Sequence, residues 1–197
     1  MSKQKIRQQE RRLPGDLYDY PIPQEIEDAW NKGWITSEFI IYLVKGGFFK
    51  KPASLKYHLS YKGGLYIHSN NVMNHLIRMT NDLGLVWQNE RSPFLVGMFH
   101  DICKMDNYVD KFTCDDDDSE YEWNPNQVLK GHGDKSVMIL SQFFQLTEEE
   151  VLCIRYHMGA YEQDDWEGFD KAIRKYPNVL YTHTADMYAS KVLENLD

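Results

Sequence analysis

The distribution of apolar and polar positions predicts a chain built mainly of helices. The segment QEIEDAW at residues 24–30 predicts a short helix that ends near Gly33. The residues at 36–37, Thr and Ser, offer an N-cap for a second helix, SEFIIYLVK, which ends at Gly46. We expect these two helices to form a small N-terminal layer beside a larger bundle.

The helical pattern resumes in the middle of the chain. Intervals of four and three residues separate His68, Val72 and His75, which places all three on one helical face. Ser followed by Pro at 92–93 is typical of the N-cap and first position of another helix. Its apolar residues lead directly into a His-Asp pair at 100–101. This pair is therefore expected at the C-terminal end of a buried helix.

Three helical segments are predicted in the last third of the chain. The first covers about 133–144. In the second, Thr147 with Glu150 three residues later forms a capping box that opens EEEVLCIRYHM. The third covers about 178–196 and carries Asp186 near its middle.

One stretch, residues 107–127, breaks the helical period. Its aromatic residues alternate around an acidic run at 115–118, which predicts a β-hairpin or a long surface loop. The segment is a candidate lid. The acidic run itself is most often a solvated loop, with cation binding as the secondary interpretation.

Composition fits one soluble domain. The chain has 197 residues, of which 42% are hydrophobic and 26% charged. We expect a frayed or disordered arm at 1–15 and a single domain at 16–197.

No apolar run approaches the roughly 20 residues that cross a bilayer, and the first dozen residues lack an apolar targeting segment. Three cysteines without a CxxC spacing indicate a reducing compartment, so we expect a cytoplasmic protein, in the host cytoplasm if a bacteriophage encodes it.

The formal net charge of −8 argues against an extended nucleic-acid surface, because binding to the phosphate backbone relies on a basic face. A small phosphorylated ligand needs only a local positive site, which a divalent metal ion can supply. We expect no membrane partner, and a homo-oligomer is left open.

Histidine and aspartate residues near several different predicted helices are the candidate metal ligands. A helical bundle can direct one side chain from each of several helices into a shared polar pocket. Imidazole and carboxylate ligands suit manganese, iron, cobalt, nickel, zinc or magnesium. The candidates are His68, His100, Asp101, His132, His157 and Asp186.

The segments around these candidates resemble the HD superfamily of metal-dependent phosphohydrolases, across roughly 54–193. The family pattern is a single His, an adjacent His-Asp pair and a distant Asp. FHDICK matches the HD-x-x-K form, and YHLSYKGGLYIHS looks like the stretch before the first ligand in a branch that includes 3′-to-5′ exoribonucleases. GHGDKS, RYHMG and HTADMYAS are similar to later segments of small HD proteins of bacteria and bacteriophages.

The resemblance implies an all-α HD-type bundle with His68, His100, Asp101 and Asp186 as core metal ligands. His132 and His157 correspond to the extra histidines of binuclear members that cleave cyclic dinucleotides, where they would hold a second ion. The GYP segment and doubled histidine of one such group are missing here. In mononuclear nucleotidases of the family, groups at such positions bind the substrate phosphate instead.

The expected activity is hydrolysis of a phosphate ester or anhydride in a nucleotide, either a nucleoside 5′-monophosphate or a deoxynucleoside triphosphate. Asp101 and Lys104 are the catalytic candidates, and Lys104, Lys135 and Arg155 are candidates for substrate contacts. A phosphodiesterase acting on cyclic or short oligonucleotides is the first alternative. A metal-stabilised binding module without turnover is the second.

Other polar and aromatic residues have simpler explanations. His75 and His183 are expected to be structural, His58 has either a substrate or a surface role, and Cys103 is expected to be a core thiol. Packing is the first role expected of the aromatic residues, and stacking on a base is the secondary one for Tyr61, Tyr66, Trp123 and Tyr161.

Overall fold

A computed structural model gives the fold of residues 20–111, 120–161 and 164–195. The predicted arm at 1–15, Cys114 and the acidic run at 115–118 lie outside these described residues. The chain divides into two compact units, 1–45 and 46–197. The prediction of a single domain at 16–197 stays a prediction.

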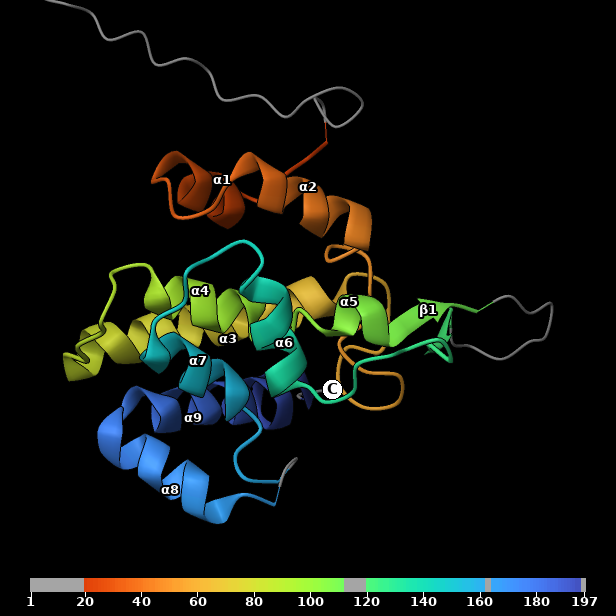
Figure 1. The fold of residues 1–197 in the computed structure, drawn as a ribbon. Coiled ribbons are helices and arrows are strands. Elements are labelled where there is room, and N and C mark those ends of the chain that lie inside the picture. Colours follow the sequence, from red (N-terminus) through yellow and green to blue (C-terminus); the bar gives the residue numbers. More distant parts are fainter. Residues whose placement is uncertain (1–19, 112–119, 162–163, 196–197) are drawn as a thin grey trace, which may run out of the picture. The chain divides into compact units, whose positions relative to one another are not determined.

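The described elements confirm an all-helical fold with one small hairpin (Figure 1). In chain order they are α1 (Gln24–Asn31), α2 (Ser37–Gly46), α3 (Gly64–Leu83), α4 (Ser92–Phe99), α5 (Lys104–Asn107), β1 (Tyr108–Asp110), β2 (Tyr121–Trp123), α6 (Gly133–Leu140), α7 (Glu148–Arg155), α8 (Trp166–Lys175), α9 (Asn178–Lys191) and the 3-10 helix η2 (Leu193–Asn195).

The described part of the first unit contains the two predicted N-terminal helices. α1 is followed by a turn in which Gly33 has a φ of +75°, a backbone conformation that favours glycine. The Thr36 hydroxyl accepts a hydrogen bond from the Phe39 N–H at 3.2 Å, which caps α2 as the sequence predicts. Ile26, Phe39 and Ile40 are buried.

In the second unit, α3 packs against α4 and α9, while α7 packs against α9, α6 and α4. Gly97 allows the close approach of α3 and α4, because a Cβ at this position would lie 2.5 Å from the Met73 Cα. Gly133 plays the same part between α6 and α7, where a Cβ would collide with the Arg155 carbonyl oxygen. These contacts bring α4 close to α3 and the start of α6 close to the end of α7.

The predicted interruption at 107–127 forms an antiparallel hairpin that continues from α5 (Figure 1). Tyr108 pairs with Trp123, and Asp110 pairs with Tyr121. The Asn124 N–H donates to the Asn107 carbonyl oxygen at 2.9 Å, which closes the base of the hairpin. Both ends of the hairpin are therefore tied to the helices that carry the candidate site.

The helix boundaries differ from the sequence predictions in several places. α6 ends at Leu140 and not near 144, and α7 ends at Arg155, so the predicted YHM at 156–158 follows the helix. α8 was not predicted, although Trp166, Phe169 and Ile173 recur at helical spacing and the Asp165 side chain accepts from the Gly168 N–H as an N-cap. The last helix ends at Lys191 and is followed by η2, so it does not reach 196. Ser92 is the first residue of α4 and not its cap, and its hydroxyl donates to Glu150 at 2.9 Å.

Candidate metal centre

The six candidate ligands lie on or next to five helices of the second unit. His68 is in the second turn of α3, and Asp186 is in the middle of α9. The His-Asp pair at 100–101 directly follows α4, as predicted. His132 immediately precedes α6, and His157 follows α7 by two residues. All except His132 are buried.

Four of these residues converge on one point. His68 Nε2 lies 3.2 Å from Asp186 Oδ1, 3.3 Å from His100 Nε2 and 3.5 Å from Asp101 Oδ2. His100 Nε2 lies 3.5 Å from Asp101 Oδ2 and 3.9 Å from Asp186 Oδ1. Each of the two imidazole nitrogens thus lies 3.2 to 3.9 Å from a carboxylate oxygen of Asp101 and from one of Asp186, in residues from three different helical segments.

The other ring nitrogen of each imidazole fixes the orientation of the ring. His100 Nδ1 donates to the Gly97 carbonyl oxygen at 2.9 Å, and His157 Nδ1 donates to the Ile154 carbonyl oxygen at 2.7 Å. A proton held on Nδ1 leaves the lone pair of Nε2 for a metal ion. The local turns after α4 and α7 therefore prepare both rings as Nε2 ligands.

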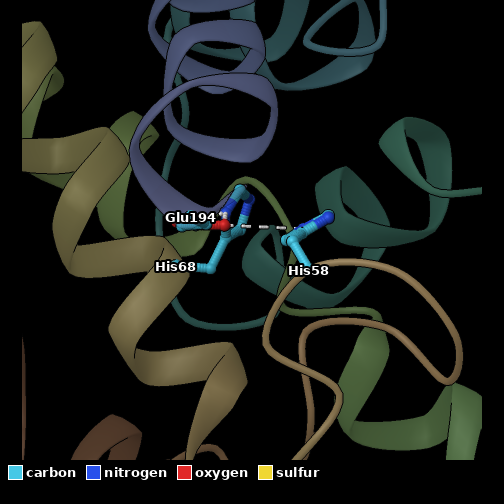
Figure 2. Close-up of side chains that lie close together, drawn as sticks. All are labelled: His58, His68 and Glu194. Carbon is cyan, nitrogen blue, oxygen red and sulfur yellow. Dashed lines mark hydrogen bonds and ion pairs between the residues drawn. The ribbon is translucent and has the colours of Figure 1, made fainter. Parts of the chain in front are cut away.

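His68 is oriented by a carboxylate instead. Its Nδ1 lies 3.1 Å from both oxygens of Glu194 in η2, and the Asn71 amide donates to the same carboxylate at 3.0 Å. Figure 2 shows His58 reaching Glu194 from the loop before α3; the His58 Nε2 to Glu194 Oε2 distance is 3.8 Å. A carboxylate behind a metal-binding imidazole fixes its tautomer and raises its basicity.

Burial and charge set the ionisation of this cluster. Burial alone would lower the pKa of His68, but its hydrogen bonds to Asp186 and Glu194 outweigh burial and raise the pKa to about 9. Burial lowers the pKa of His100 to about 4, against the opposing effect of Asp101. Burial acts to raise the pKa of Asp186, but His68 and the other nearby histidines together outweigh burial and hold this pKa well below its usual range.

Lys104 neutralises part of the negative charge of Asp101. Its ammonium donates to Asp101 Oδ2 at 2.6 Å from one turn further along the chain. Burial acts to raise the pKa of Asp101, but Lys104 and His100 outweigh it and hold that pKa well below the usual value. The contact that would orient Asp101 is present, whereas a phosphate contact by Lys104 stays a prediction.

The second oxygen of Asp101 faces the other two histidines. Asp101 Oδ1 lies 3.4 Å from His157 Nε2 and 3.7 Å from His132 Nδ1. Among the described residues, neither Asp101 Oδ1 nor His157 Nε2 has a hydrogen-bond partner, although both atoms are buried. The nearby carboxylate of Asp101 raises the pKa of His132 to about 10. Cys103 lies close enough to Asp101 and His132 to complete a second group of three ligand atoms.

The residues present fit a divalent metal ion. Two ligand atoms that each lie about 2.1 Å from an ion are about 3.0 Å apart at right angles and about 3.4 Å apart in a tetrahedron. The separations of 3.2 to 3.9 Å between the first four residues are close to these values. Among the described residues, the buried atoms Asp101 Oδ1 and His157 Nε2 lie 3.4 Å apart without a hydrogen bond, which is a further sign that a cation could lie between such groups. These buried groups could hold a metal ion.

Two predicted substrate contacts lie beside the centre. The Lys135 ammonium is buried and donates to Asp106 Oδ2 at 2.6 Å and to Asn107 Oδ1 at 2.9 Å. The Arg155 guanidinium lies 3.4 Å from Asp134 Oδ1, and its side chain is about one-third exposed. Their roles in substrate binding stay predictions.

The remaining histidines outside the ligand set have packing partners. His75 stacks on Tyr188 with ring centroids 4.4 Å apart. His183 Nδ1 donates to the His157 carbonyl oxygen at 2.7 Å, so it supports the turn that carries a candidate ligand. Cys103 is buried, in agreement with the interpretation as a core thiol.

Sequence reasoning missed Glu194, which lies 126 residues from His68 along the chain. No motif marks it, because it belongs to a short helix after α9 and is defined only by what it touches. The Asn71 side chain was missed for the same reason, although its position one turn after His68 on α3 would have suggested a shared face.

Comparison with known proteins adds no relatives. No family model, no curated protein and no solved structure matches this chain. Among the described residues, no helix has both the length and the apolar character needed to cross a membrane.

Proposed function

We propose that this protein is a metal-dependent phosphohydrolase of the HD type that cleaves a phosphate ester or anhydride bond of a nucleotide. The observation that carries the proposal is the convergence of His68, His100, Asp101 and Asp186 on one buried point. These are the four residues that the sequence resemblance nominates as ligands, and they come from distant parts of the chain. Buried imidazoles and carboxylates in this number suit a divalent transition metal.

Such an ion, when bound, lowers the pKa of its water so that hydroxide is available near neutral pH and offsets charge on phosphoryl oxygens. The protein's own residues would hold and orient the reacting groups. Glu194 keeps His68 in the tautomer that presents Nε2. Lys104 holds Asp101 through one oxygen and leaves the other directed toward His132 and His157. His132, with about 29% of its side chain exposed, is the candidate for contact with substrate phosphate.

A second candidate function is a phosphodiesterase that acts on cyclic or short oligonucleotides with two ions. The observation that favours it is the division of Asp101: Oδ2 faces His68 and His100, whereas Oδ1 faces His132 and His157. A carboxylate between two sets of ligands can bridge two ions, which would clamp the attacking and leaving oxygens.

An activity screen with added metal tests both proposals. Nucleoside mono- and triphosphates, cyclic dinucleotides and short single strands would each be incubated with manganese, iron, cobalt, nickel, zinc or magnesium and the products separated by chromatography. We expect mononucleotides to be cleaved faster than oligonucleotides. The reverse order would favour the phosphodiesterase. Absence of cleavage in every case, with metal bound, would favour a binding module without turnover.

A further inference from the structure

A pocket lies next to the candidate metal centre, at the base of the hairpin. Its volume is about 210 Å³, and it is lined by Asn107, Trp123, Gln127, Lys130, Gly131 and His132. His132 also lies 3.7 Å from Asp101, measured from Nδ1 to Oδ1. One imidazole therefore separates the pocket from the metal ligands.

The size of the pocket selects the kind of ligand. At about 210 Å³ it holds several waters, each of which takes about 30 Å³ in the liquid. It is smaller than the roughly 300–1,000 Å³ typical of pockets for whole drug-sized ligands. A pocket of this size could take one ring system of a nucleotide, and the rest of the nucleotide would extend past His132 toward the metal centre.

Trp123 gives the pocket an aromatic wall that is held in place. It is the direct cross-strand partner of Tyr108, and the two rings meet edge to face with centroids 5.7 Å apart. Tyr108 is buried, whereas Trp123 is 50% exposed. Of the four aromatic residues that the sequence nominates for base stacking, Trp123 is the one that lines this pocket.

A chain of hydrogen bonds fixes the polar edge of the pocket. Lys135 can only donate, so the Asn107 atom that it contacts at 2.9 Å is the oxygen. The same oxygen accepts a short hydrogen bond from the Gln127 amide nitrogen. Because the Gln127 side-chain nitrogen is used in this hydrogen bond, the side-chain oxygen of Gln127 is the atom that could accept a hydrogen bond from an N–H group of a ligand.

We propose that this pocket binds the nucleobase of the substrate, with the base stacked on Trp123 and one of its N–H groups donating to Gln127. The inference deepens the proposed function and rests on it for the nucleotide substrate. The protein would recognise the substrate by its base, and the phosphate of the same nucleotide would lie on the side of His132 and the metal centre.

The test uses nucleosides, which have no phosphate to bind a metal. Adenosine and cytidine would be titrated into the full-length protein as purified, and binding would be followed by calorimetry. Loss of a stacking aromatic typically weakens binding by about 5- to 150-fold. We expect Trp123→Ala to raise the Kd within this range and Trp123→Phe to raise it less. Trp166→Ala, which removes an indole that is 62% exposed on α8, is the matched control and should leave the Kd unchanged.

A second variant tests the polar edge. Gln127→Met keeps the side-chain length but removes the acceptor, so it should also raise the Kd for both nucleosides. An unchanged Kd in Trp123→Ala, or no nucleoside binding by the wild-type protein, would overturn the inference. Nucleoside binding requires no turnover, so binding without phosphohydrolase activity would overturn the proposed function alone. Cleavage of a small aryl phosphate without nucleoside binding would overturn the inference alone.

Discussion

The two oxygens of Asp101 face surroundings that differ in rigidity. On the Oδ2 side, His68 and His100 are buried, Lys104 contacts the oxygen itself, and the rings are fixed by Glu194 and a backbone carbonyl. On the Oδ1 side, His157 is buried and fixed, but His132 is partly exposed beside an open pocket. Firmly held ligands such as those on the Oδ2 side suit permanent metal binding, and an accessible side chain such as His132 suits contact with a substrate. Under the proposed function, Asp101 would therefore join the part of the site that holds the metal ion to the part that faces the substrate.

The largest expected effect comes from the residue shared by both sides. Asp101→Asn keeps the shape of the side chain but removes its charge, so the bound ion and its activated water should be lost together. We expect activity to fall by more than the about 10- to 100-fold typical of residues that only support a ligand. Elemental analysis of protein purified without added metal measures the loss. Asp82→Asn, which alters an exposed carboxylate on α3, is the matched control.

Metal content at the wild-type level in Asp101→Asn would remove this residue from the ligand set. The different surroundings of the two Asp101 oxygens would then have no bearing on metal binding.

The next prediction distinguishes two roles for the histidines beside Asp101 Oδ1, which are binding of a second ion and contact with the substrate phosphate. If His132 and His157 hold a second ion, His157→Ala and His132→Ala should each lower the metal-to-protein ratio. The double variant should then be scarcely worse than either single one, because the residues serve the same ion. If they contact phosphate, the metal ratio stays constant and kcat/KM falls. Metal analysis together with kinetics on the best substrate distinguishes the models, and wild-type values for both in all three variants would contradict each.

A smaller effect is expected from Glu194, which acts through His68. Glu194→Ala removes the acceptor for His68 Nδ1 and should weaken metal affinity by about 10- to 100-fold, as such supporting carboxylates do. Glu194→Gln keeps one acceptor oxygen and should restore part of the affinity. Competition with a metal-binding dye measures both. Equal affinity in wild type and Glu194→Ala would show that the Oδ2 side does not depend on this contact.

Local sequence signals were enough to predict the helices that have capping and apolar patterns of their own. The box at Thr147 and Glu150 is present, and the hairpin lies within the predicted interruption. α8 was missed although Trp166, Phe169 and Ile173 recur at helical spacing, so the sequence did carry a signal for this helix. In the site, the ligand candidates could be named from their positions near different predicted helices and from the resemblance to the HD superfamily. Glu194 could not, because its role depends on where α9 ends and η2 turns, which is a tertiary property.

The smallest effect on the site should come from a change at Thr147, at the N-terminal end of α7, the helix that leads to His157. The Thr147 hydroxyl accepts from the Glu150 N–H at 3.1 Å, and the Glu150 carboxylate accepts from the Thr147 N–H at 2.8 Å. Thr147→Ala removes the first bond and should lower the free energy of unfolding by about 1 kcal/mol, the typical cost of losing such a cap. Denaturant titration measures this change.

The metal content and kcat/KM of Thr147→Ala should nevertheless stay at wild-type values. The ring of His157 is fixed at the C-terminal end of α7 by the Ile154 carbonyl oxygen, and His183 donates to the carbonyl oxygen of His157 from α9. Neither contact involves the cap. A fall in metal content that accompanies the loss of stability would mean that the Oδ1 side is positioned by α7 as a whole, and that its accessibility reflects a loosely held helix end and not an opening for substrate.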